Sequence, residues 1–320
     1  MANATAELMK AVAIARFGSL DELKFQDVTK PEPAPGEVLI RIHAAGVGIW
    51  DSMQRQGEMG PEHPYFPLVL GGECSGEIER LGANVTSLKT GDPVYTYFNA
   101  KQGAYSQYVA VKADMVAAKP ASLSFIEAAA APVDAITAHQ AIVDELKLKS
   151  GEWFYVAGGA GGVGMMAVQL AVNIGARVIA SASAESFALL ESLGVSPENL
   201  VDYKKSDVVR AVRLITGGTG VDAAIDAVGG EHSKETFSTV RDGGRIAELT
   251  GEDLPKERNV TVFYIESKPS AKRLDVLTDL FDAGKLKVRV GEVFALADAR
   301  KAQAAVEGSH GSGKIVLQVL

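Results

Sequence analysis

A run of glycines in the middle of the chain constrains its fold more than any other feature. Residues 153–157 are apolar, aromatic or β-branched, which predicts a short buried strand. Glycines follow at once, and apolar residues then recur with helical spacing over 163–171. Gly159, Gly161 and Gly164 match G-x-G-x-x-G between a strand and a helix. Such glycines allow a tight turn and bring a pyrophosphate close to the free N–H groups of the helix N-terminus, so the stretch predicts a dinucleotide site.

Strands and helices alternate from about residue 124 onward. The expected strands are 153–157, 177–183, 200–203, 221–228 and 244–249, and the expected helices are 125–145 with a break at Pro132, 163–172, 185–193 and 206–214. Further helices near 272–282 and 297–307 and a closing strand at 314–320 are expected after this series. The alternation predicts a parallel, doubly wound α/β sheet.

Residues 9–120 follow a different pattern, in which turn signals separate short segments. The expected strands are 10–15, 38–43, 76–82, 92–97 and 105–111. With 320 residues in total, two domains are expected, one made mainly of strands and one with the alternating pattern.

Composition excludes several classes of partner. The formal net charge is −8, which argues against nucleic acid and anionic membrane surfaces. Cys74 is the only cysteine, so no internal disulfide can form and a reducing compartment is expected. Residues 1–8 lack the pattern of a signal peptide, and no apolar run reaches the length of a membrane span. We therefore expect a soluble, cytoplasmic protein.

Several short motifs, in order and at characteristic spacing, resemble those of the medium-chain dehydrogenase/reductase superfamily, and within it the zinc-less NADPH:quinone oxidoreductase branch. They are Ala44-Ala-Gly-Val with Asp51, Gly71-Gly-Glu-Cys-Ser-Gly76, Gly91-Asp-Pro-Val94, Gly103-Ala-Tyr-Ser-Gln-Tyr108, Thr137-Ala138, the glycine turn, Asp226-Ala-Val-Gly-Gly230 and Gly313-Lys-Ile-Val316. The resemblance implies a GroES-like (chaperonin-10-like) β-barrel catalytic domain and a Rossmann cofactor domain. The implied boundaries are 1–124 and 263–320 for the catalytic domain and 125–262 for the cofactor domain.

The same resemblance makes the metal positions informative. The superfamily's zinc alcohol dehydrogenases hold catalytic zinc with Cys, His and Cys, and the matching positions here are Gly48, Gly72 and Val133. None of these side chains can ligate a metal, and one cysteine cannot build a second, structural zinc site. We expect no metal. Quinone oxidoreductases commonly carry Asn where this chain has Gly48, so a hydrogen-bonding side chain is also absent.

The resemblance implies that the substrate pocket is lined by variable loops around 50–67 and 95–101, and most candidate catalytic residues lie there. Gly48 and Asp51 belong to the family motif, and Trp50 either lines the substrate pocket or packs in the core. Tyr65 and Tyr97 are candidate proton donors, and Trp50, Tyr97 and Phe98 offer flat apolar surfaces for a planar acceptor. The set is Gly48, Trp50, Asp51, Tyr65 and Tyr97.

The cofactor is expected to be NADP(H) rather than NAD(H). NAD-specific sites place an acid at the end of the second strand to bind the ribose 2′-hydroxyl, but here no acid occurs before Glu185. Ser181 and Ser183 leave room for a 2′-phosphate, or alternatively they only cap the next helix. The resemblance adds further cofactor-binding candidates. These are Thr137, Gly159, Gly161, Gly162, Val163, Gly164, Tyr203, Lys204, Val228, Gly229, Thr250 and Lys314.

The favoured function is hydride transfer from NADPH to a quinone or an α,β-unsaturated carbonyl. The alternatives are a non-catalytic crystallin-like or regulatory protein and an alcohol or aldehyde reductase. A short-chain dehydrogenase is disfavoured because about 150 residues precede the glycine turn and Pro269 follows the Tyr264/Lys268 pair. A homodimer is expected through an edge strand at 259–265, which could instead be an ordinary buried strand.

Overall fold

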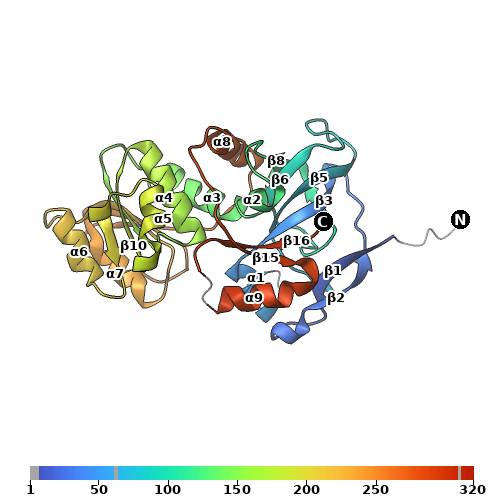
Figure 1. Cartoon of the computed structure of the whole chain (residues 1–320), viewed down its shortest axis with the longest axis horizontal. Coiled ribbons are helices and arrows are strands. Elements are labelled where there is room, and N and C mark those ends of the chain that lie inside the picture. Colours follow the sequence, from blue (N-terminus) through green and yellow to red (C-terminus); the bar gives the residue numbers. More distant parts are fainter. Residues whose placement is uncertain (1–6, 61–63, 309–310) are drawn as a thin grey trace, which may run out of the picture. The chain divides into compact units, whose positions relative to one another are not determined.

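The computed structural model describes residues 7–60, 64–308 and 311–320 (Figure 1). Backbone contacts divide the chain into two compact units. Unit 1 holds the chain up to Val133 together with Pro269–Gly284 and Val288–Leu320, and unit 2 holds Asp134–Lys268 and Lys285–Lys287. Each unit has its own hydrophobic core.

Unit 2 is built on a six-stranded sheet in which all neighbouring strands are parallel. The strands are β9 (Trp153–Ala157), β10 (Arg177–Ala182), β11 (Leu200–Asp202), β12 (Val221–Asp226), β13 (Val240–Glu248) and β14 (Thr261–Tyr264). The order β11-β10-β9-β12-β13-β14 corresponds to 3-2-1-4-5-6. The order in which strands are added to the sheet reverses between the parallel neighbours β9 and β12. The predicted parallel, doubly wound sheet is confirmed.

The helices of unit 2 connect these strands (Figure 1). They are α3 (Pro132–His139, whose first two residues belong to unit 1), a π-helical segment (Gln140–Glu145), α4 (Gly162–Ile174), α5 (Phe187–Ser192), α6 (Val208–Ile215) and α7 (Glu231–Thr239), with 3₁₀ turns at Ala184–Ser186 and Pro197–Asn199. Pro132 is the first residue of α3. The N–H at this position has no partner within a helix, so a proline, which lacks it, is well tolerated there. Gly175 ends α4 in the left-handed conformation, with φ of 86°.

Unit 1 consists mainly of antiparallel strands in two sheets of orders β15-β16-β3-β5-β6-β8 and β2-β1-β4, with β7 paired to β3. The strands are β1 (Leu8–Ile14), β2 (Lys24–Thr29), β3 (Glu37–Val47), β4 (Leu68–Val69), β5 (Glu73–Leu81), β6 (Pro93–Tyr97), β7 (Tyr108–Lys112), β8 (Val116–Ala118), β15 (Val290–Ala295) and β16 (Lys314–Gln318). The C-terminal strand β16 pairs with β3, so the end of the chain lies in the same unit as the N-terminal strands.

Helices and 3₁₀ turns complete unit 1. They are α1 (Ile49–Gln56), α2 (Phe125–Ala129), α8 (Ala271–Asp282) and α9 (Ala299–Glu307), with 3₁₀ turns at Leu20–Glu22, Ala113–Met115 and Leu296–Asp298. In α2, Ser124 and Glu127 form a reciprocal capping box.

The expected loop at 50–67 is wrong in its first part, which belongs to helix α1. Asp51 accepts a hydrogen bond from the Gly48 N–H, and Gly57 ends the helix in the left-handed conformation. Trp50 is therefore on a helix, whereas Tyr97 is the last residue of β6, within the strand expected at 92–97. Helix α7 and strand β15 were not expected. The polar residues of α7 and the mostly exposed residues of β15 carry little hydrophobic periodicity.

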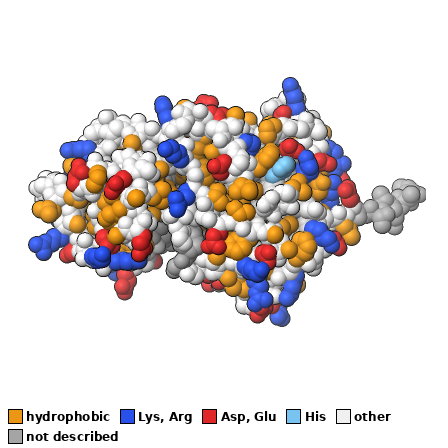
Figure 2. Space-filling view, in the orientation of Figure 1, with side chains coloured by type: hydrophobic (Ala, Val, Ile, Leu, Met, Phe, Trp, Pro, Cys, Tyr) orange, Lys and Arg blue, Asp and Glu red, His pale blue; other side chains and the backbone are white. Residues whose placement is uncertain are grey.

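The surface is mixed in character. On the face that Figure 2 shows, acidic, basic and apolar side chains are interspersed. Within the described residues, no helix has both the length and the apolar composition that crossing a membrane requires.

Candidate cofactor turn and candidate active site

The glycine turn of unit 2 lies between β9 and α4, and its glycines have separate structural reasons. Gly158 has a φ of 74°, which other residues rarely adopt. A Cβ at Gly164 would lie 2.1 Å from the Gly158 carbonyl oxygen, so helix and turn can approach only with glycine there. Gly161 precedes α4 and has no side chain to cap its first N–H groups. A helix that begins in this way can present those N–H groups to a phosphate.

Asp134 lies beside the start of α4 and was not among the residues singled out from the sequence. Its side chain is 4% exposed, and a Cβ at Gly162 would lie 2.1 Å from its Oδ2 atom. The acid therefore requires glycine at 162. A carboxylate at a helix N-terminus also stabilises the helix. The same helix, α3, carries Thr137, whose side chain is 7% exposed.

The loop after β12 is held in place by the last residue of that strand. Asp226 is fully buried, and its Oδ1 accepts hydrogen bonds from the N–H groups of Val228 at 3.0 Å and Gly229 at 3.2 Å. A Cβ at Gly158 would lie 2.9 Å from Val228 Cγ2. The structure thus brings the loop after β12 against the glycine turn. Asp226 appeared in the sequence only as the start of a motif, although an Asp that hydrogen-bonds the backbone two residues later is a recognisable signal.

The loop after β13 is held in the same way. Glu248 is 1% exposed and accepts the N–H groups of Thr250 at 2.8 Å and Gly251 at 2.6 Å. A Cβ at Gly229 would lie 2.7 Å from the Thr250 side chain. The candidates Val228, Gly229 and Thr250 therefore lie together at the carboxyl ends of the strands, where doubly wound sheets bind their ligands.

The two candidate serines at the end of β10 differ in environment: Ser181 is within the strand, and Ser183 follows its last residue. Ser181 is 5% exposed, and its hydroxyl accepts a hydrogen bond from Tyr155 Oη at 2.8 Å. Ser183 is partly exposed, and its side chain makes no capping bond to the following 3₁₀ turn. Ala182 pairs with Asp202 in the neighbouring parallel strand, so Tyr203 and Lys204 follow that strand at the level of Ser183. Both residues are exposed.

In unit 1, Asp51 is the centre of a buried polar cluster. Its Oδ2 accepts hydrogen bonds from the Gly48 N–H at 2.9 Å and from Tyr105 Oη at 3.0 Å. Burial raises the pKa of Asp51 to about 6, against the opposing effects of these two bonds and of the Lys314 charge. The carboxyl group is 1% exposed, so it positions the start of α1 from inside the protein.

Lys314 lies in the same unit, beside Trp50. Its Nζ is 2.7 Å from Glu73 Oε1 and 4.2 Å from the centre of the Trp50 ring system. Lys314 is 7% exposed and Glu73 is fully buried. Glu73 Oε2 also accepts the Val133 N–H at 2.9 Å. Glu73 was not singled out from the sequence, where it stands between Gly72 and Cys74.

The two candidate tyrosines lie in different surroundings. Tyr97 ends β6, and its ring lies 3.8 to 4.0 Å from the place that a Cβ of Gly72 would take. Tyr65 is 78% exposed. Tyr97 is therefore the tyrosine that lies at the positions matching the zinc ligands.

Those positions contain no donor set for a metal. Gly48 and Gly72 have no side chain and Val133 has an apolar one. Among residues 7–60, 64–308 and 311–320, no group of three His, Cys, Asp or Glu side chains is placed to hold a metal ion.

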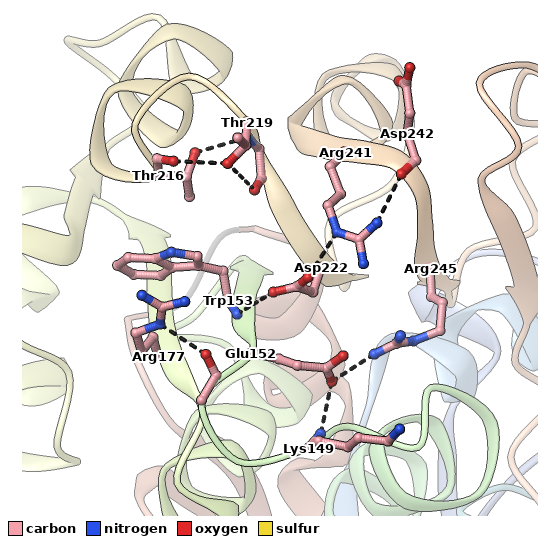
Figure 3. Close-up of polar contacts among 12 residues, drawn as sticks. Lys149, Glu152, Trp153, Arg177, Thr216, Thr219, Asp222, Arg241, Asp242 and Arg245 are labelled. Carbon is pink, nitrogen blue, oxygen red and sulfur yellow. Dashed lines mark hydrogen bonds and ion pairs between the residues drawn. The ribbon is translucent and has the colours of Figure 1, made fainter.

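The amino ends of the strands in unit 2 carry a separate polar network (Figure 3). Asp222 accepts hydrogen bonds from the Trp153 N–H and from Arg241 Nε, both at 2.8 Å. Glu152 accepts from Arg245 and from a backbone N–H at 2.8 Å each. Figure 3 shows the Trp153 indole lying over the Arg177 guanidinium. The guanidinium carbon is 4.3 Å from the centre of the Trp153 ring. Two surface hollows of about 350 and 550 Å³ flank this network.

A parallel sheet in 3-2-1-4-5-6 order with a glycine turn at its carboxyl end is the arrangement that binds dinucleotides in doubly wound folds. Two family models match the chain: "Alcohol dehydrogenase GroES-like domain" over residues 34–121 and "Zinc-binding dehydrogenase" over 197–317. A 2-methylene-furan-3-one reductase of Solanum lycopersicum is 30% identical over 97% of this chain and 79% of its own length. A quinone oxidoreductase of Pongo abelii is 27% identical over 97% of this chain and 98% of its own.

Solved structures agree with this assignment. A structure titled NAD-dependent alcohol dehydrogenase has a TM-score of 0.89 and 31% identity, covering 98% of this chain and all of the other. A mycobacterial protein described as complexed with NADPH has a TM-score of 0.88 and 29% identity, covering 97% of this chain and all of the other. The chain belongs to the medium-chain dehydrogenase/reductase superfamily, and it is an enzyme like that superfamily's quinone and enone reductases.

Proposed function

We propose that the protein transfers hydride from NADPH to a quinone or an α,β-unsaturated carbonyl without the help of zinc. The observation that carries the proposal is the chemistry of the positions matching the zinc ligands. Gly48, Gly72 and Val133 offer no donor, and the adjacent carboxylate of Glu73 is bound to Lys314 and to a backbone N–H. The names of the relatives support the same class of acceptor.

The absence of ligand side chains decides between alcohols and activated acceptors. An alcohol must lose its proton as hydride leaves, which enzymes assist with a zinc-bound alkoxide or a tyrosine activated by lysine. A quinone or enone relaxes this demand, because added hydride gives a delocalised anion that water can protonate. Positioning the flat acceptor and excluding bulk water then supply much of the rate enhancement.

The residues of the glycine turn fit a nicotinamide dinucleotide, which when bound supplies the hydride. The N–H groups at the start of α4 would hold its pyrophosphate. We infer a preference for NADP(H) because β10 ends at Ala182, followed by Ser183, with no acid to repel a 2′-phosphate. Ser183, Tyr203 and Lys204 would contact that phosphate, whereas the hydroxyl of Ser181 is bound to Tyr155.

A turnover assay tests the acceptor class. NADPH absorbance is followed with 1,4-benzoquinone, 9,10-phenanthrenequinone and 2-cyclohexen-1-one, alongside primary and secondary alcohols with NADP. Turnover of at least one quinone or enone is expected. Turnover of alcohols alone would contradict the proposal, and silence on every substrate despite cofactor binding would favour the non-catalytic alternative.

Metal analysis tests the zinc-free part separately. Activity should survive exhaustive chelation, and the purified protein should contain far less than one zinc per chain. Stoichiometric zinc together with activity lost on its removal would contradict this part of the proposal.

We also propose a homodimer formed through strand β14. This strand is at the edge of the sheet in unit 2, with β13 as its neighbour, and such an edge can extend into a second copy. Light scattering at micromolar concentration should give about twice 33.6 kDa. A particle of 33.6 kDa would contradict it.

A further inference from the structure

The indole of Trp50 fills the space that a side chain at position 48 would need. A Cβ built on Gly48 would lie 2.2 Å from both Cε2 and Cζ2 of Trp50 and 2.5 Å from Cη2. Gly48 has φ of −125° and ψ of 166°, a conformation that any residue adopts. The backbone therefore does not require glycine at this position, whereas the indole does. A side chain at 48 and the indole of Trp50 exclude each other.

Charged groups also contact the same indole. Lys314 Nζ lies over the ring at 4.2 Å from its centre, which is the geometry of a cation–π contact. The ammonium group is bound to Glu73 at 2.7 Å, and Glu73 in turn accepts the Val133 N–H. Because Lys314 and Glu73 are buried, these interactions are shielded from water. The indole thus occupies the space that Gly48 leaves free and is held by a buried ion pair.

Trp50 is nevertheless only partly buried, and its neighbour Ile49 is half-exposed. An indole is the largest and most electron-rich flat surface among the side chains. Planar rings stack on such a surface in offset geometry, and an electron-poor ring stacks best on an electron-rich one. Quinones are planar and electron-poor, whereas a small enone offers little area for stacking.

We propose that Trp50 is the residue that selects quinones, above all polycyclic ones, over small enones, that Gly48 leaves room for its indole, and that the Lys314–Glu73 pair keeps the indole in place. This inference rests on the proposed function, because it names the acceptor that the enzyme prefers. It assigns to Gly48 a steric role, and to Lys314 the role of a positioning residue for Trp50.

Turnover by Trp50→Leu is the first test. With NADPH, kcat/KM for 9,10-phenanthrenequinone should fall about tenfold, while kcat/KM for 2-cyclohexen-1-one should change less than about threefold. The matched control is Trp153→Phe, at the other tryptophan, which should change neither value. Equal losses on both substrates would overturn the inference while leaving the proposed function standing. If the wild-type protein reduces no quinone and no enone, the proposed function fails, and the fluorescence titration below then decides whether Trp50 binds a quinone.

Fluorescence tests the stacking without turnover. The chain has two tryptophans, so Trp153→Phe leaves Trp50 as the sole reporter. Titration with 9,10-phenanthrenequinone should quench its emission in a saturable way, and the complementary Trp50→Phe variant should show only the linear quenching of free N-acetyltryptophanamide. Linear quenching in both variants would overturn the inference.

A double-mutant cycle tests the exclusion between positions 48 and 50. Gly48→Ala should lower Tm and raise KM for the quinone, whereas Gly48→Ala combined with Trp50→Ala should have the Tm of Trp50→Ala alone. Additive losses of Tm would show that the indole is not what requires glycine, and would overturn this part.

The positioning role of Lys314 has its own readout. In the Trp153→Phe background, Lys314→Met should shift the emission maximum of Trp50 and raise KM for the quinone more than it lowers kcat, and Lys314→Arg should restore both. An unchanged emission maximum, or an arginine variant that restores nothing, would contradict the role.

Discussion

The acidic side chains at the two ends of the sheet in unit 2 have different hydrogen-bond partners. At the amino end, Glu152 and Asp222 accept hydrogen bonds from backbone N–H groups and from arginines, so acids and bases are paired within the protein (Figure 3). At the carboxyl end, Asp226 and Glu248 are also buried, but each bends back to hold the loop that follows its own strand.

The difference suggests that the amino end of the sheet serves stability and that the carboxyl end serves cofactor binding. Paired groups at the amino end satisfy the backbone and hold neighbouring strands together. At the carboxyl end, acids shape the loops, while the residue before α4, Gly161, has no side chain to cap the first N–H groups of the helix. We therefore expect substitutions at the amino end to change stability alone, and substitutions at the carboxyl end to change cofactor binding.

The largest effect is expected from Gly164→Ala. Its Cβ would lie 2.1 Å from the Gly158 carbonyl oxygen, so α4 must move away from the turn. We expect the free energy of unfolding to fall by about 3 kcal/mol and NADPH affinity to fall at least about 100-fold. Denaturant unfolding and calorimetry measure the two quantities. Gly311→Ala is the control, because a Cβ there meets no atom of the described residues within 4 Å. Unchanged NADPH affinity in Gly164→Ala would show that the turn is not the binding element.

Next in size is Asp222→Ala, at the amino end. Its loss leaves the Trp153 N–H and the Arg241 guanidinium without their acceptor, which should cost about 2 kcal/mol of unfolding free energy. The Kd for NADPH should not change. Asp242→Ala, whose side chain is 82% exposed, should cost less than about 0.5 kcal/mol. A weaker NADPH affinity in Asp222→Ala would break the separation between the two ends.

The same residue predicts a pH dependence of stability. Burial raises the pKa of Asp222, but the hydrogen bonds from Arg241 and Trp153 outweigh it, and the pKa lies below its ordinary value. Its stabilising effect should be complete above the unfolded value of about 3.9 and be lost as the pH falls through the lowered folded value. Between about pH 5 and 3, the wild type should lose more unfolding free energy than Asp222→Asn. Parallel curves for the two proteins would contradict this.

A smaller effect distinguishes Ser181, inside β10, from Ser183, just after it. Ser181→Ala removes the acceptor of the buried Tyr155 hydroxyl and should cost about 1 kcal/mol of stability without changing cofactor preference. Ser183→Ala should leave stability unchanged and weaken NADPH binding about threefold relative to NADH. The reverse pattern would place Ser181, not Ser183, at the 2′-phosphate.

The parallel sheet and its glycine turn could be predicted because local signals agree there. Residues 153–157 read as a buried strand, the glycines as a turn and 163–171 as a helix, and all three are confirmed. Helix α1 was missed because a glycine-flanked stretch resembles a loop, although Asp51 at the third helical position is a capping signal.

The environment of the candidate sites could not be predicted, because it depends on contacts between distant residues. The sequence does not show that Lys314 lies over Trp50, or that the Asp134 carboxylate lies against Gly162. Ser181 and Ser183 are two residues apart, yet one is buried against Tyr155 and the other is partly exposed. The roles assigned to the candidate residues stay predictions.

The central claim is that the carboxyl end of this sheet binds NADP(H), and calorimetric titration tests it most directly. NADPH should bind at least about tenfold more tightly than NADH, a difference of roughly 1.4 kcal/mol. Ala182→Asp should invert this preference, because the new carboxylate would repel the 2′-phosphate and accept a hydrogen bond from the ribose of NADH. Asp222→Asn, at the amino end, should leave both affinities unchanged. Equal affinities for the two cofactors in the wild type, or a preference unaltered by Ala182→Asp, would contradict the account.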